Sequence, residues 1–112
     1  MNQDQLRNLH IDSLHLEAIK AAENCQRSEA YLLQVLEIVD ERGLHLECEL
    51  TSLYQYCTML LGLSEAVAYS LIAVIRKGRE VPELKLAVLE GKVTLSKAKK
   101  ICSVINPKNH AF

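Results

Sequence analysis

The 112-residue sequence contains no tryptophan, and its aromatic residues are four tyrosines and one phenylalanine. Leucine, isoleucine, valine and alanine supply most of the apolar content, a mixture that suits helix-on-helix packing better than sheet packing. The four glycines are isolated in the sequence, which excludes a glycine-rich phosphate-binding loop. We therefore expect an all-α fold.

Long apolar runs are also missing. No segment approaches the roughly 18 uninterrupted apolar residues of a membrane-spanning helix, and the polar start, residues 1–4 (MNQD), lacks the regions of a signal peptide. The chain is 49% apolar and 24% charged, as in ordinary globular proteins. We expect a single helical domain over residues 1–112, located in the cytoplasm and without membrane contact.

The four cysteines lie far apart in the sequence, at positions 25, 48, 57 and 102. No C-x-x-C pair is present, and no histidine stands at zinc-ligand spacing from a cysteine. We expect reduced thiols that pack as small apolar residues. The sequence predicts neither a metal site nor a cofactor.

Charge is divided unevenly along the chain. Residues 1–63 hold four basic and ten acidic residues, a balance of −6, whereas residues 64–112 hold nine basic and four acidic residues, a balance of +5. A basic half suits a polyanion, because each phosphate contact releases condensed counterions. Alternatively, the two halves attract each other, within one chain or between two.

A long helix is predicted over residues 13–42, capped by Asp12 or Ser13 and stopped by Gly43. Its length exceeds what a core of short helices can cover, so we expect a homodimer through this helix. The alternative is a break near residues 24–28, which would fold the two pieces into a hairpin. One apolar seam, interrupted by Glu29, runs along the helix through Ala18, Ala22, Cys25, Leu32, Leu36 and Val39.

Residues 44–50 alternate apolar and polar side chains, and we interpret them as an extended connector whose leucines pin it to the core. Two short helices are predicted over residues 82–105. Pro82 starts the first, Gly91 ends it, and Asn106-Pro107 stops the second.

Residues 52–78 have the pattern of a helix-turn-helix. Gly62 can adopt the left-handed conformation that closes a helix, and Ser64 can cap the next one. An αα-hairpin in a helical bundle would show the same helix-ending glycine and capping serine between its two helices. The side chains predicted to point inward are Cys57, Leu61, Leu63, Ala68, Leu71 and Ile75. Those predicted to point outward, as toward a major groove, are Glu65, Ala66, Tyr69, Ser70, Ala73, Arg76 and Lys77.

Several segments carry a family resemblance: residues 52–57 (SLYQYC), 61–66 (LGLSEA) and 91–96 (GKVTLS), together with Ala68-Tyr69 and Asn109-His110. In these segments the chain resembles the N-terminal region of bacterial HNH endonucleases. Residues 82–98 are also similar to the helical region that follows the helix-turn-helix of ParB-type partition proteins. Both resemblances imply duplex DNA as the partner.

The HNH family carries arginines directly after the tyrosine matched by Tyr69, where this chain has Ser70 and Leu71. The resemblance therefore implies weak or non-specific DNA binding. The family's catalytic module lies further toward the C-terminus. His10, His15, His45 and His110 do not form its metal-binding ββα motif, so we assign no catalytic residue.

Together, these arguments predict a non-catalytic DNA-binding domain, with a helical dimerisation module as the alternative. The residues expected to contact DNA are Ser64, Glu65, Ala66, Tyr69, Ser70, Arg76, Lys77, Arg79, Lys97, Lys99 and Lys100.

Overall fold

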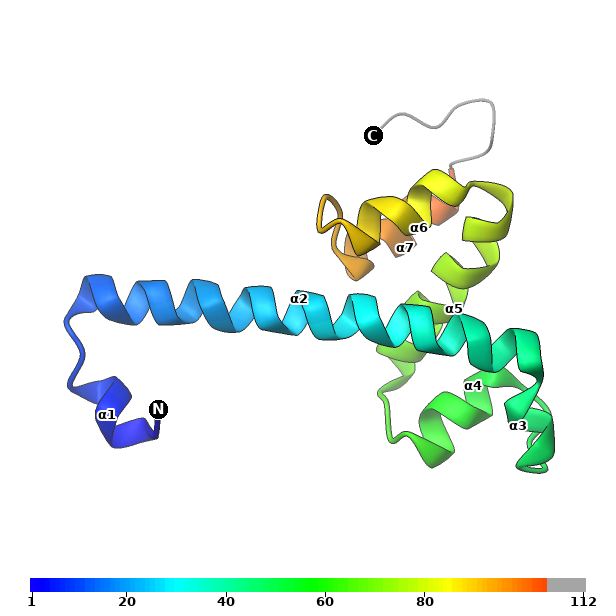
Figure 1. Ribbon diagram of the computed structural model, residues 1–112, viewed down its shortest axis with the longest axis horizontal. Helices are drawn as coiled ribbons and strands as arrows, with labels where there is room; N and C mark the ends of the chain where they lie inside the picture. The colour runs from blue at the N-terminus through cyan, green and yellow to red at the C-terminus, as the bar shows by residue number, and fades with distance from the viewer. Residues whose placement is uncertain (105–112) are drawn as a thin grey trace.

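The computed structural model describes residues 1–104, which form helices and turns without any strand (Figure 1). The all-α prediction is therefore confirmed. The helical elements are α1 (Gln3–Arg7), α2 (Ile11–Arg42), α3 (Leu44–Glu47), α4 (Leu53–Gln55), the π-helix η1 (Tyr56–Leu60), α5 (Glu65–Glu80), α6 (Pro82–Leu89) and α7 (Leu95–Cys102). None of them is long and apolar enough to cross a membrane.

The predicted long helix is confirmed as one continuous element, so the alternative of a break near residues 24–28 is wrong. The helix begins two residues earlier than predicted, and neither Asp12 nor Ser13 caps it. Instead, the Nδ1 atom of His10 accepts a hydrogen bond of 3.2 Å from the backbone N–H of Asp12. Gly43 ends α2 in the left-handed conformation, at φ 66°.

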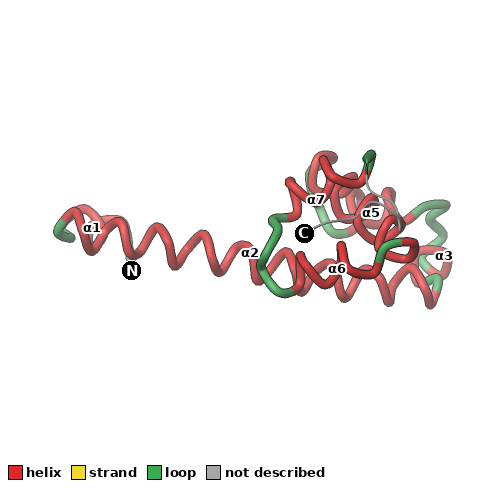
Figure 2. The backbone as a smooth tube through the Cα atoms, turned by 90° about the horizontal axis from the view of Figure 1, so that it is seen from above, coloured by secondary structure: helices red, strands yellow, loops and turns green. Residues whose placement is uncertain are grey.

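The two halves of α2 have different surroundings (Figures 1 and 2). Residues 29–42 lie against α5, α6 and α7, and with α3 to α7 they form what we call the body. Residues 11–28, none of which is buried, continue the helix away from the body, with the residues around Gln26 still beside the link between α6 and α7, and we call them the arm. Every buried residue of α2 belongs to the body half: Leu33, Leu36 and Val39.

Helix α5 is the centre of the body, because α2, α4, η1, α6 and α7 all pack on it. Leu71 and Val74 of this helix are fully buried, as are Leu33 and Leu36 of α2. Further core side chains come from α4, η1, α5, α6, α7 and the residue between α5 and α6: Leu53, Cys57, Ala68, Ile72, Ile75, Val81, Leu84, Ala87, Val88, Leu95 and Ala98.

The corner between η1 and α5 forms with the predicted residues but a different local geometry. Gly62 has φ 68°, and the Ser64 hydroxyl accepts a hydrogen bond of 3.2 Å from the Val67 N–H. Leu61 was predicted to point inward, yet it is 41% exposed. Its N–H bonds to the carbonyl of Tyr56, a π-helical spacing that turns Leu61 away from the buried face followed by Cys57.

The predicted extended connector over residues 44–50 is wrong. Directly after Gly43 the chain forms the single-turn helix α3, and Glu49 then reverses the chain with φ 63°. Leu44 packs against the core, whereas Leu46 is exposed. Alternation of apolar and polar residues over so few positions did not distinguish a strand from one turn of helix.

Toward the C-terminus, α5 continues through Gly78 to Glu80, although the sequence predicted a stop at this glycine. A side-chain carbon at Gly78 would lie 3.3 Å from Cβ of Lys85, so the glycine allows α5 and α6 to approach each other closely. Pro82 begins α6 as predicted, and Thr94 caps α7. The predicted stop at Asn106-Pro107 lies outside the described residues.

Candidate polyanion interface

The exposed face of α5 is a narrow stripe. Glu65, Ala66, Tyr69 and Arg76 are exposed, as predicted, while most remaining positions of the helix are covered by its neighbours. The stripe begins at Ser64, which is itself exposed but whose hydroxyl is engaged in capping the helix. Any ligand of this face would therefore meet the first turns of α5 and then Arg76.

Ser70 is not on this stripe, which corrects the prediction. It is only 8% exposed, and its hydroxyl donates a hydrogen bond of 2.9 Å to the carbonyl of Ala66 within the same helix. This internal bond satisfies the hydroxyl, so a polar residue is tolerated in the core. The sequence around Ser70 did not indicate that neighbouring helices cover α5 on several sides.

Tyr69 is the meeting point of α4, α5 and α7. Its ring stacks on the ring of Tyr54, with centroids 4.8 Å apart and planes inclined by 29°. The Lys99 ammonium nitrogen lies 5.9 Å from the Tyr69 ring centroid, within the range of a cation–π contact. Tyr69 remains 53% exposed, so its outer side is open to a ligand.

Tyr54 supports this cluster from α4. Desolvation, the nearby Glu65 carboxylate and the hydrogen bond to Tyr69 raise the pKa of Tyr54 to about 12. The hydroxyl therefore stays protonated at neutral pH. No local sequence pattern could reveal the stack, because it depends on how α4 packs against α5.

Three exposed cations lie on α7, which packs along α5: Lys97, Lys99 and Lys100. Lys99 lies beside Tyr69, whereas Lys97, two residues earlier, projects from the other flank of α7. Within residues 1–104, these lysines and Arg76 form no ion pair with a carboxylate. We call the exposed residues Tyr69, Arg76, Lys97, Lys99 and Lys100 together the basic face.

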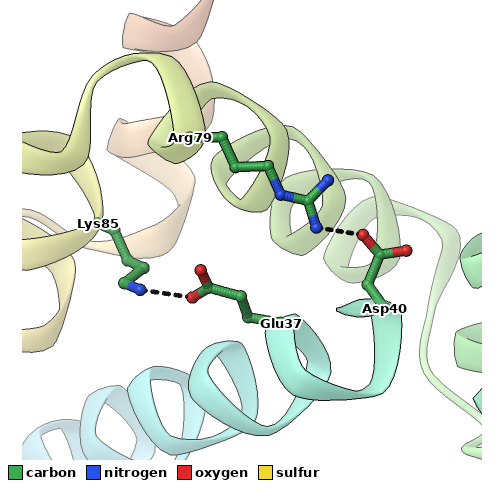
Figure 3. Close-up of polar contacts among 4 residues, drawn as sticks. All are labelled: Glu37, Asp40, Arg79 and Lys85. Atoms are coloured by element: carbon green, nitrogen blue, oxygen red, sulfur yellow. Dashed lines mark hydrogen bonds and ion pairs between the residues drawn. The ribbon is translucent and has the colours of Figure 1, made fainter. Parts of the chain in front are cut away.

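Two predicted DNA contacts are instead engaged with carboxylates. Arg79 pairs with Asp40 of α2 (Figure 3). Lys77 is half-buried and pairs with Glu80 at 3.2 Å. These pairs neutralise cations that sequence reasoning had assigned to phosphates.

A second ion pair between α2 and the other helices of the body lies beside the pair of Arg79 and Asp40. The ammonium of Lys85 in α6 lies 2.6 Å from a carboxylate oxygen of Glu37 in α2 (Figure 3). The opposite charges of the two chain halves are thus partly matched within one molecule, as one of the sequence hypotheses proposed.

Within residues 1–104, no three His, Cys, Asp or Glu side chains gather in an arrangement that could hold a metal ion. His10 caps α2, and His110 lies outside the described residues. Burial raises the pKa of the Cys57 thiol. It also raises the pKa of Cys102, where the positive charge of Lys77 acts in the opposite direction. Buried thiols with a raised pKa are poor nucleophiles.

Comparison of the chain with protein-family models, with characterised proteins and with solved structures finds no match.

Proposed function

We propose that the chain is a non-catalytic DNA-binding domain that holds duplex DNA through the phosphate backbone. The observation that supports this proposal is the basic face, where Lys99 lies over the exposed Tyr69 ring and where four exposed cations have no carboxylate partner within the described residues 1–104. Such a surface attracts a polyanion and gains from the release of counterions. The likeness of the sequence to HNH endonuclease and ParB-type proteins points to the same partner, and we accordingly propose a cytoplasmic protein.

Binding of this kind would show little preference among DNA sequences. Ser70 is buried, and the arginines that the HNH family has after its tyrosine are absent. Glu65 lies on the exposed stripe of α5 and repels phosphates near Tyr69. With few side chains able to read base edges, most of the binding free energy would come from phosphate contacts.

Fluorescence anisotropy with a labelled duplex, measured over a series of salt concentrations, tests the proposal. We expect affinity to fall steeply with salt, and each phosphate contact removed should reduce the slope by about 0.9. The variant Lys97→Ala/Lys99→Ala/Lys100→Ala should lower affinity for all sequences alike. Lys20→Ala is the matched control, since Lys20 is an exposed lysine of the arm.

Two results would contradict DNA binding. One is the absence of any anisotropy change at low ionic strength. The other is an equal loss of affinity in the triple variant and in the Lys20→Ala control, because the basic face would then have no special role.

A second candidate function is self-association without nucleic acid. It is favoured by the arm, where no residue from 11 to 28 is buried although Ile11, Leu14, Leu16 and Ile19 are apolar and exposed. Multi-angle light scattering of the purified chain tests it directly. A dimer mass supports this candidate, and a monomer mass at every concentration removes it.

A further inference from the structure

The arm is a helix without support. An isolated helix of this length is marginal in water, because helices gain most of their stability from packing an apolar face. The arm spans about 27 Å of helix, and none of its side chains is buried. Exposed leucines and isoleucines on such an element indicate a missing partner.

One side of α2 carries a regular heptad seam from the arm into the body. Alternating steps of four and three residues connect its members, which are Leu14, Ala18, Ala21, Cys25, Ser28, Leu32, Val35 and Val39. This spacing is that of a coiled-coil interface. The arm contributes a leucine, two alanines, a cysteine and a serine, whereas the body half contributes the larger aliphatic residues Leu32, Val35 and Val39.

The body end of the seam opens into a groove between α2 and α3. It has a volume of 480 Å³, and its lining is mainly apolar. Val35 and Ile38 in this groove are 40% and 49% exposed. The residues that line the groove are Gln34, Val35, Ile38, Val39, Arg42, Leu44 and Glu47.

The arm of the same molecule cannot fill this groove. Leu14 and Val39 belong to one continuous helix, so they stay about 38 Å apart. Helix α1 is joined to the far end of the arm, away from α3 (Figure 1). An arm that reaches the groove must therefore come from another molecule.

We propose that a second copy of this chain docks antiparallel along α2, with its arm in the groove. In this register Leu14 faces Val39 of the other copy, and Ala18 faces its Val35. Ala21 then faces its Leu32, and Cys25 faces its Ser28. Two of these four layers, Ala18 with Val35 and Ala21 with Leu32, combine a small residue with a larger one, which allows close packing, and two-fold symmetry fills both grooves at once.

The helix dipoles also favour the antiparallel orientation. Antiparallel docking brings the first turn of α2 in one copy, the positive end of its dipole, near the last turn of α2 in the other copy, the negative end. A parallel pair would place like dipole ends together.

A matched pair of variants tests the interface by sedimentation equilibrium. Leu14→Lys and Leu16→Lys make the same substitution at exposed leucines on opposite sides of the arm, 42% and 57% exposed. We expect Leu14→Lys to raise the dimer dissociation constant by about tenfold or more, and Leu16→Lys to leave it nearly unchanged. A chain that is monomeric at every concentration, or equal effects of the two variants, would overturn the proposal.

The orientation has its own test, performed with the exposed Cys25 and Cys48 replaced by serine. Under oxidation, a mixture of the Ala18→Cys and Val35→Cys proteins should form a mixed disulfide dimer, because these positions face each other only in the antiparallel register. Each variant alone should stay uncross-linked. Cross-linked homodimers of each variant would show parallel pairing, which would overturn the register while leaving self-association, the second candidate function on which this inference rests, intact.

Discussion

The arm and the body are parts of one helix-rich chain, yet they are stabilised in different ways. In the body, the same α2 helix is buried at Leu33 and Leu36 and clamped by Lys85 and Arg79. In the arm none of its side chains is buried, and within residues 1–104 the ion pairs of the arm join residues close together along the chain. The difference shows that regular helical geometry does not reveal whether a helix has its tertiary partner.

The largest expected effect comes from equal truncation of a leucine in each region. Leu36→Ala removes a fully buried side chain and should lower the free energy of unfolding by about 3 kcal/mol. Leu16→Ala, at a site that is 57% exposed, should change it by less than about 0.5 kcal/mol. Urea unfolding followed by circular dichroism measures both, and similar losses would erase the distinction between body and arm.

The junction where α2 ends should show a smaller effect. Gly43 has φ 66°, and a side-chain carbon there would meet only Leu46 at 3.7 Å. Gly43→Ala should therefore cost about 1 to 2 kcal/mol through the left-handed conformation alone. The same unfolding measurement checks this value, and an unchanged midpoint would mean that the turn relaxes without strain.

The ion pair between Glu37 of α2 and Lys85 of α6 should contribute less to the free energy of unfolding than Gly43 does. Glu37→Gln, which breaks the half-buried pair with Lys85, is expected to cost about 1 kcal/mol. Its counterpart in the arm, Glu23→Gln, breaks the exposed pair with Arg27 and should cost about 0.3 kcal/mol. Denaturation midpoints at low and high salt would check the ranking, and a larger loss for Glu23→Gln would reverse it.

The smallest effect concerns protonation at the edge of the basic face. The pKa of Tyr54 is raised from 10.0 to about 12, so its unfolded form loses a proton first as pH rises. The contribution of this group to stability should fall between these two values. Glu65→Gln should lower the pKa of Tyr54, as measured by tyrosinate absorbance with Tyr54→Phe to assign the signal. An unchanged titration would exclude the carboxylate as a cause.

Much of the fold could be predicted because its signals are local. Gly43 and Gly62 supply the left-handed turns, and Ser64 supplies a cap, each within a few residues. The predictions that were wrong concerned features that depend on tertiary structure. The π-helical turn exposed Leu61, and the packing of neighbouring helices around α5 buried Ser70.

The candidate site was predicted only in part for the same reason. The exposure of Tyr69, Arg76 and the α7 lysines follows from helical periodicity. The engagement of Arg79 with Asp40, 39 residues away, does not. Long-range ion pairs and stacked rings depend on which helices meet, and spacing along one helix contains no information about that.

Amide hydrogen exchange over a series of protein concentrations is the most direct test of the contrast between arm and body. Amides of residues 68–76 should be strongly protected at every concentration, because the body contains its own core. Protection of residues 15–28 should be weak in dilute protein and increase with concentration, as a second copy covers the arm. Strong protection of residues 15–28 at all dilutions, in a chain shown to be monomeric, would contradict this difference.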